Sequence, residues 1–497
     1  MRVTHVGRSL LWALPFCLVL NLKAGETLQP PAPAKASPLI EEEQPLETLP
    51  TSLLKLLKKH KVPENNLSIY VRDLSAKQPL LAHNIDIPRA PASTIKLVTT
   101  YAALKQLGPN YTWRTEAWTR GKLESGVLQG DLILKGHGDP FLVYEQFWKF
   151  VQELRDRGLQ EITGDIIIDS SYYHIPRHQN SAFDGQGFRV YNAGPSPLMF
   201  NFQASRLMLQ VPHDPASANA EVKPYPPSEA LVIDNQVSLV KGKCKRRHGR
   251  PRLSWGAEKQ LIVKGQFSVN CKPRYLMRLL SSPEQHAYDA FRNFWQTSQG
   301  NFHGILKQGQ VESGDELFHS YVSPTLGEQI RLINKWSNNV MTRQLLLTTG
   351  AERLGAPATL EKGREAVLSV LSQQGIDVAD LIIDNGSGLS RKSRISARQM
   401  SQLLAAAYRD PFMPEFMSSL SLPGLDGTLA SRFKHEDLKG RSHLKTGTLN
   451  RVTAIAGYML NRHGRRLVII IQHNGPRATA ARGATIQDEI LRWAFEQ

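Results

Sequence analysis

A serine and a lysine three residues apart could perform nucleophilic chemistry in this 497-residue chain. Ser93 begins an apolar-striped helix expected to run to about Gln106, and at a helix start its oxygen lies near backbone N–H groups without intrahelical partners. Lys96 falls on the same face of the helix, within reach of the serine oxygen. A free lysine has a pKa of about 10.4, so Lys96 can accept the serine proton only if burial or a second cation lowers that value. The pair therefore predicts a closed pocket and a second cation.

The Ser-x-x-Lys pattern alone is weak evidence, because it recurs in the chain. For any single match the alternative is a solvated serine of an ordinary helix or loop. The matches are Ser52/Lys55, Ser93/Lys96, Ser238/Lys241, Ser431/Lys434 and Ser442/Lys445. Ser93 is distinguished from the other four serines because two further motifs later in the chain could act together with it.

The second motif is Ser337-Asn338-Asn339, which lies between two helical stretches. The Ser337 hydroxyl could carry a proton between Lys96 and a leaving amine. The Asn339 amide offers both a donor and an acceptor to a substrate peptide bond. Taken alone, the motif could also be a polar helix connection without a chemical role.

The third motif is Lys445-Thr446-Gly447-Thr448, which contains the only Lys-Thr-Gly of the sequence. It precedes a strand expected at 452–460. Gly447 would let an edge strand come close to a bound ligand. Lys445 would supply the second cation, and the hydroxyls of Thr446 and Thr448 could hold a terminal carboxylate. An ordinary strand end is the alternative for this motif in isolation.

Elements from both ends of the chain must position these motifs. Strands are expected at 67–73, 80–84, 452–460 and 467–473, and helices at 50–61, 93–106, 326–349, 360–374, 396–408 and 485–495. Between them the pattern changes to strand-like segments with many Gly and Pro turns, at 128–135, 164–169, 205–211 and 229–240. Strands flanked by helices at both ends, with an interrupting block, predict an α/β (α+β) catalytic domain, residues 50–111 and 301–497, with a β-rich insertion at 112–300.

In this order, the three motifs resemble the set of penicillin-binding proteins and serine β-lactamases. Asn338 stands where that set more often has Asp. Further segments resemble the class C low-molecular-mass penicillin-binding proteins, which are exported D-Ala-D-Ala carboxypeptidases and endopeptidases of the cell wall. These segments are 136–140, 191–198 followed by Asn201, 384–391 and 422–429. The resemblance covers roughly residues 45 to 490, and it implies a β-lactamase/transpeptidase-like domain in which helices flank an antiparallel sheet. The length of the stretch between Ser93 and Ser337 agrees with that of the inserted domains in this group.

The resemblance implies an acyl-enzyme mechanism on peptidoglycan stem peptides. Ser93 would attack the carbonyl of the penultimate D-Ala, with Lys96 as the base. The backbone N–H groups of Ser93 and Thr448 would form the oxyanion hole. β-Lactams would act as covalent inhibitors, and no cofactor or metal is expected.

The other two motifs would handle the leaving group and the substrate. Ser337 and Lys445 would relay the proton to the leaving D-Ala. Asn339 would align the peptide, while Thr446 and Thr448 would hold its carboxylate. The segment 384–391 is expected to form a wall of the cleft, with a simple tight turn as the alternative.

Two rival functions differ from a serine-type carboxypeptidase or endopeptidase. A β-lactamase would deacylate faster, but no Glu-x-x-Leu-Asn segment is present to position a deacylating water. A wall-binding or penicillin-sensing protein would only capture its ligand, and it would have no use for the Lys96 base. Release of D-Ala from a D-Ala-D-Ala peptide discriminates among these functions.

The beginning of the chain predicts export to the periplasm or cell envelope. Arg2 and Arg8 precede an apolar run at 10–22, so residues 1–25 are expected to be a signal peptide, with an uncleaved anchor as the alternative. Residues 26–49, rich in Pro and Ala, predict a flexible leader. The last helix lacks the cation-rich polar face of a membrane-surface helix, so we expect it to pack on the catalytic sheet.

The formal net charge of +17 falls by three when the signal peptide is removed. Exported proteins do not normally meet nucleic acid, so the charge predicts at most loose attraction to an anionic wall or membrane face. The densest basic run is 241–252, for which a solvated loop is the alternative. Cys244 and Cys271 are expected to form a disulfide in an oxidising compartment, with two buried free thiols as the alternative.

Overall fold

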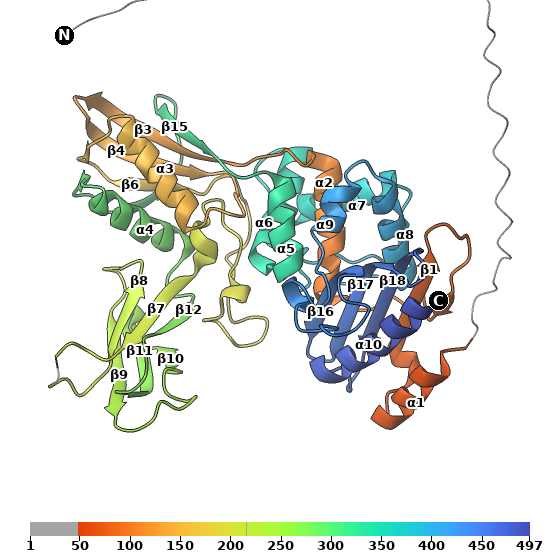
Figure 1. Cartoon of the computed structure of the whole chain (residues 1–497). Helices are drawn as coiled ribbons and strands as arrows, with labels where there is room; N and C mark the ends of the chain where they lie inside the picture. Colours follow the sequence, from red (N-terminus) through yellow and green to blue (C-terminus); the bar gives the residue numbers. More distant parts are fainter. Residues whose placement is uncertain (1–47, 215) are drawn as a thin grey trace, which may run out of the picture. The chain divides into compact units, whose positions relative to one another are not determined.

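The computed structural model describes residues 48–214 and 216–497 (Figure 1). The predicted signal peptide, residues 1–25, and the predicted leader up to residue 47 lie outside these ranges. Within the two described ranges, none of the helices has the length and apolar composition needed to cross a bilayer.

Strands from both ends of the chain form one antiparallel sheet in the order β16-β17-β18-β1-β2. Its strands are β1 (Leu67–Asp73), β2 (Leu81–His83), β16 (Ser442–Leu449), β17 (Val452–Leu460) and β18 (Arg466–Asn474). The first strand pairs with the last, with Leu67 opposite His473. This pairing confirms the predicted catalytic architecture, in which the two ends of the sequence make one sheet.

Helices cover both faces of this sheet because its strands bury side chains alternately on each side. Ile69 and Ile469 face a cluster formed with α1 (Thr51–His60) and α10 (Ala480–Glu496). Tyr70 and Ile470 face the opposite cluster, which contains α2 (Lys96–Leu107) and α8 (Ala397–Arg409). The expectation that the last helix packs on the catalytic sheet is therefore confirmed.

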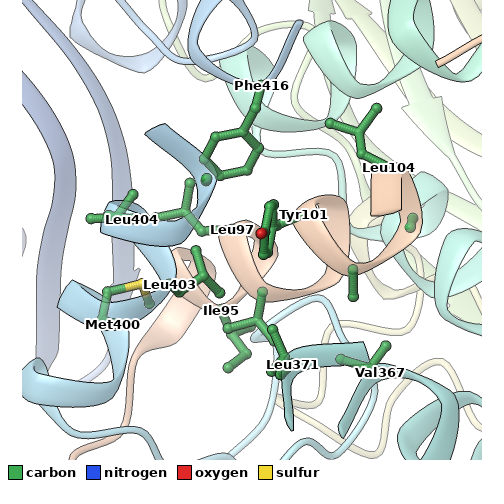
Figure 2. Close-up of a cluster of buried hydrophobic side chains, with 14 of the residues drawn as sticks. Ile95, Leu97, Tyr101, Leu104, Val367, Leu371, Met400, Leu403, Leu404 and Phe416 are labelled. Atoms are coloured by element: carbon green, nitrogen blue, oxygen red, sulfur yellow. The ribbon is translucent and has the colours of Figure 1, made fainter. Parts of the chain in front are cut away.

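The helix α2 is buried on all sides. Figure 2 shows Leu97 and Tyr101 of α2 among Leu371 of α7 (Leu360–Gln373), Leu403 of α8 and Phe416 of α9 (Met413–Ser418). The prediction of one helix over 93–106 was only partly right, because residues Ala92–Ile95 form a 3₁₀ turn and the α-helix starts at Lys96. Packing from every direction holds the start of α2 in one place.

Two helices meet at the second motif. The helices are α5 (Leu326–Trp336) and α6 (Asn339–Leu354), and Ser337 between them has a φ of +58°. A left-handed residue at this point ends the first helix and redirects the chain. The helical stretch over 326–349 thus consists of two helices, and the prediction that the Ser-Asn-Asn motif lies between two helical stretches is confirmed.

The intervening residues form three sheets and two helices. One seven-stranded sheet contains β3 (Arg114–Glu124), β4 (Val127–Gly136), β5 (Glu161–Ile162), β6 (Ile166–Asp169), β13 (Asn301–Phe302), β14 (Leu306–Gly309) and β15 (Glu316–Val322). Two three-stranded sheets contain β7 (Ser205–Gln210), β8 (Glu221–Tyr225) and β12 (Arg274–Arg278), and β9 (Ile233–Val240), β10 (Arg252–Trp255) and β11 (Leu261–Ser268). The helices α3 (Tyr144–Asp156) and α4 (Pro283–Thr297) share a buried cluster with the larger sheet. Short 3₁₀ turns occur at Glu64–Asn66, Val190–Asn192, Phe200–Gln203, Ala257–Lys259 and Gly427–Leu429.

The inserted sheet continues beyond residue 300, the predicted end of the β-rich insertion. β15 pairs antiparallel with β3, and β14 pairs with β6. Phe302 and Tyr321 are buried in the same cluster as α3 and α4. Hydrogen bonding and burial therefore extend the inserted sheet to Val322.

Cys244 and Cys271 form a disulfide. Cys244 lies in the basic run at 241–252, and Cys271 follows β11 and is buried against the cluster that contains Phe267. The bond ties the exposed basic run to the core of a small sheet. The predicted disulfide is therefore confirmed, and the alternative of two buried free thiols is wrong.

Truncation of Ile490 should destabilise the catalytic sheet, because this side chain is fully buried between α10 and the strands. We expect Ile490→Ala to lower the free energy of unfolding by about 2–5 kcal/mol. Urea unfolding followed by tryptophan fluorescence measures the loss. Thr485→Ala, at an exposed position of the same helix, is the control and should leave the midpoint unchanged; equal losses in the two variants would contradict the packing of α10.

Candidate active site

Ser93 lies in a tight turn that leads into α2. The turn is held by Thr94, whose side chain and backbone N–H both donate to the Pro91 carbonyl, at 2.8 and 3.2 Å. Ala92 has a φ of +46°, a conformation that residues with a Cβ rarely adopt. Ser93 itself is half-buried, so its hydroxyl remains open to a substrate.

Lys96 has no exposed surface, and its amine connects three parts of the chain. The Nζ atom is 3.2 Å from Ser93 Oγ and 2.7 Å from Asn339 Oδ1, and it also donates to the Ser387 carbonyl. A neutral amine has two N–H donors, which the last two partners accept, and one lone pair. That lone pair is left for the hydroxyl hydrogen of Ser93.

The surroundings of Lys96 favour this neutral form. Burial lowers the pKa of Lys96 well below its ordinary value, and the charges of Lys445 and Arg343 lower it further. Lys96 thus has the closed environment and the neighbouring cation that its pairing with Ser93 requires.

Lys445 and Ser337 form the second lysine–serine pair. Lys445 Nζ is 3.0 Å from Ser337 Oγ and 2.8 Å from the Thr446 carbonyl. Burial lowers the pKa of Lys445 to about 7. Near neutral pH this amine can therefore both hold a proton and give it up.

The two asparagines of the second motif have different surroundings. Asn338 caps α6, since its side chain accepts from the Met341 N–H at 3.1 Å. Asn and Asp both cap helices well, which explains why Asn is suitable where Asp is commoner. Asn339 instead faces Lys96, and its amide nitrogen is 3.4 Å from the Tyr191 carbonyl.

Gly447 lies on the edge strand β16, close to the nucleophile's turn. A Cβ at Gly447 would lie 2.8 Å from the backbone nitrogen of Ser93 and 2.7 Å from the Pro91 carbonyl. From the sequence we expected Gly447 to let the edge strand come close to a bound ligand. In the structure its missing side chain lets the strand come close to the backbone of Ser93. Thr446 and Thr448 alternate with Lys445 and Gly447 along the strand.

Several residues at the site were not predicted individually. Gly388 has a φ of +80°, and a Cβ there would overlap the Ala92 carbonyl. Thr428 accepts a hydrogen bond from the Thr446 hydroxyl at 2.7 Å. Both lie in segments, 384–391 and 422–429, that resemble the class C penicillin-binding proteins. Arg343 belongs to none of the sequence motifs, so nothing in the sequence pointed to it. It is a buried cation on α6 that donates to the Ala193 carbonyl.

The structure thus brings the five predicted residues into one site, in which Lys96 is bonded to Ser93 and Asn339, and Lys445 to Ser337. The charge of Lys445 acts on Lys96. Thr446 and Gly447 adjoin this site from the edge strand, and Thr448 continues that strand as an exposed residue. Cys271 belongs to a different cluster, in the inserted sheets, and the exposed Cys244 is bonded to it.

A family model settles what kind of protein has this arrangement. The model of the D-Ala-D-Ala carboxypeptidase 3 (S13) family matches residues 49–497. The chain belongs to this family. The match confirms the resemblance to class C low-molecular-mass penicillin-binding proteins and makes the chain a serine-type D-Ala-D-Ala carboxypeptidase.

Individual relatives agree over most of the chain. It is 24% identical over 440 residues to D-alanyl-D-alanine carboxypeptidase DacB of Haemophilus influenzae, covering 84% of this chain and 87% of the relative. It is 26% identical over 445 residues to D-alanyl-D-alanine carboxypeptidase of Actinomadura sp., covering 84% and 79%. The crystal structure of penicillin binding protein 4 (dacB) from H. influenzae matches with a TM-score of 0.74 at 22% identity, over 90% of this chain and 99% of that one. This structural likeness confirms the predicted fold class.

Gly388→Ala should slow acylation by penicillin, because the new methyl group would push against the backbone that carries Ser93. A displacement of about 1 Å in a catalytic group costs on the order of 10²-fold in rate. Stopped-flow labelling with a fluorescent penicillin measures the rate.

Gly375→Ala is the matched control for this variant. Gly375 has a similar φ, +70°, but a Cβ there would meet nothing within 4 Å. Both variants therefore strain a left-handed residue, and only Gly388→Ala disturbs the turn. Similar acylation rates in the two would show that Gly388 does not position Ser93.

Proposed function

We propose that this chain releases the terminal residue of peptidoglycan stem peptides through an acyl-enzyme on Ser93, and that β-lactams acylate the same hydroxyl. The observation that carries the proposal is the buried Lys96 amine, whose Nζ atom lies 3.2 Å from Ser93 Oγ. Neutral lysine is a base strong enough to take the serine proton.

The first step forms the ester. Lys96 accepts the hydroxyl proton while Ser93 Oγ attacks the carbonyl carbon of the penultimate D-Ala. The backbone N–H groups of Ser93 and Thr448 would stabilise the negative oxygen. Asn339, held by Lys96 through its oxygen, would align the peptide bond with its amide nitrogen.

The second pair serves the leaving group. As the C–N bond breaks, the departing nitrogen needs a proton, and Lys445 would supply it through the Ser337 hydroxyl, 3.0 Å away. A pKa near 7 makes that transfer accessible at neutral pH. Thr446 and Thr448 would hold the carboxylate of the terminal D-Ala. The proton taken from Ser93 would then pass from Lys96 to Lys445, which restores the neutral Lys96 amine. Water would attack the ester carbonyl while Lys96 accepts its proton, and as the C–O bond breaks Lys96 would give that proton to Ser93 Oγ.

The same chemistry would cleave crosslinks between stems. In a crosslink the leaving amine belongs to another stem peptide, and the bond broken is still that of a D-Ala carbonyl. We therefore include endopeptidase activity on crosslinked muropeptides in the proposal. Sensitivity to β-lactams is supported by the H. influenzae relative, whose structure was determined in complex with a novel β-lactam.

This activity requires an exported protein, which we propose to be located in the periplasm or cell envelope. The support comes from the sequence: a signal peptide is predicted at residues 1–25. The packing of α10 against the sheet leaves its apolar face unavailable to a membrane surface. Any remaining attraction to the envelope would then come from the positive charge of the chain.

Ser93→Ala should abolish both penicillin labelling and the release of D-Ala from a pentapeptide, because the Ser93 hydroxyl lies 3.2 Å from the Lys96 amine in a site that also holds the Lys445–Ser337 pair. Intact-mass spectrometry followed by peptide mapping locates the adduct. Ser431→Ala, which removes an exposed serine of another Ser-x-x-Lys match, is the control and should label normally. An adduct on any serine other than Ser93 would refute the proposal.

A further inference from the structure

A large cavity lies in the inserted part of the molecule, apart from the residues of the three motifs. Its volume is about 1110 Å³, and its walls come from β10, the end of β12, the start of α4 and the loop at 177–189. Figure 1 labels these strands and the helix. A volume of this size accommodates a ligand as large as a short peptide.

The cavity is rich in arginine. Arg177, Arg189, Arg252 and Arg278 line it, and none of the lining residues that the structure describes is an Asp or Glu. Burial lowers the pKa of Arg278, and the charge of Arg189 lowers it further, so two like charges face each other here. Guanidinium groups held together in this way would be stabilised by a bound anion, and their planar shape suits carboxylates.

One carboxylate lies near this cluster but is already engaged. Asp184 interacts with Arg189, while its two oxygens accept hydrogen bonds from Tyr191 Oη at 2.7 Å and Asn192 Nδ2 at 2.8 Å. Asp184 therefore braces the loop on which Arg189 lies. Arg177 and Arg252 are exposed, and Arg278 donates to the Met277 carbonyl at 2.8 Å. None of these three arginines forms an ion pair with a described residue, so their charges remain available to a ligand.

The cavity also presents an aromatic face. Trp255 stacks on Phe188 with ring centroids 5.4 Å apart, yet 48% of its surface is exposed. Leu231 and Leu253 lie among the lining residues beside it. A ligand that fits this wall has apolar surface as well as negative charge.

The loop that walls the cavity continues into the active site. Arg189 is two residues from Tyr191, so their Cα atoms are at most about 7 Å apart. The Tyr191 carbonyl contacts Asn339, and the Ala193 carbonyl accepts from Arg343. A ligand in the cavity and a substrate on Ser93 would thus lie on two sides of one short segment.

We propose that this cavity binds a second stem peptide of the peptidoglycan while the first is held at Ser93, with its free carboxylates on the arginines and its apolar surface on Trp255. The inference rests on the proposed function, and it makes polymeric or crosslinked peptidoglycan the preferred substrate. A wall polymer with a phosphate on every unit fits less well, because it has little apolar surface to cover Trp255, Leu231 and Leu253, which line the cavity together with the arginines.

The test compares two double variants that lose the same charge. Arg177→Gln/Arg252→Gln removes two exposed arginines of the cavity. Arg246→Gln/Arg250→Gln removes two exposed arginines of the basic run that do not line it. Each enzyme is assayed for D-Ala release on soluble pentapeptide and on high-mass crosslinked peptidoglycan.

We expect the cavity variant to raise KM on crosslinked peptidoglycan by about tenfold or more, since a hydrogen bond to a charged group is worth roughly 1.5–3 kcal/mol. Its kinetics on pentapeptide, and both activities of the control variant, should stay unchanged. An equal rise in the control variant would mean general attraction by charge, and an unchanged KM in the cavity variant would mean that the cavity binds no substrate. Either result would overturn the inference.

Direct binding separates this inference from the catalytic proposal. Ser93→Ala protein, titrated calorimetrically with a purified crosslinked muropeptide dimer, should bind it, and the Arg177→Gln/Arg252→Gln change should weaken that binding. Binding of a poly(glycerol phosphate) at the cavity in place of the dimer would overturn the inference. Failure of the native enzyme to release D-Ala from pentapeptide would instead refute the catalytic proposal. The role of the cavity would then still be tested by whether the arginine changes weaken binding of the dimer.

Discussion

The Lys96 amine is enclosed by protein between Ser93, Asn339 and the Ser387 carbonyl, and the other features of the site depend on keeping it there without a proton. Burying an amine in its charged form is costly, so the site favours the neutral base. Its two N–H donors have fixed acceptors, which leaves its lone pair for the hydroxyl of Ser93, the proposed nucleophile. Lys445 strengthens the effect by adding positive charge nearby.

This requirement explains why so much of the domain converges on one turn. The helix α2 is packed on all sides, so the start that carries Ser93 and Lys96 cannot shift. Gly388 and Gly447 then allow a loop and the edge strand to approach the turn more closely than any residue with a Cβ would permit. The central sheet supports this arrangement by joining β1, near the beginning of the chain, to β16–β18 near its end.

Much of this arrangement could be predicted from the sequence, because the three motifs are short and lie on strongly patterned elements. The presence of strands at both ends of the chain, the flanking helices and the joint role of Lys445 and Ser337 follow from them. The end of the inserted sheet could not be predicted, since β14 and β15 pair with strands well over a hundred residues away and carry no local sign of that pairing. The role of Gly447 was also hidden, because the backbone that it approaches belongs to residues 91–93. Arg343 was missed for a similar reason: its partner is a backbone carbonyl in the 191–198 segment.

The pH dependence of penicillin acylation in the native enzyme and in Lys445→Met tests the central claim most directly. Lys96 must be neutral to act, so the acylation rate should fall on the acid side as Lys96 gains a proton. The charge of Lys445 lowers the pKa of Lys96, and its removal should raise that pKa and shift the acid limb of the profile to higher pH. Thermal melting serves to show that both proteins are folded. An acid limb at the same pH in both proteins would contradict the account, because Lys96 would then not be the titrating base that Lys445 controls.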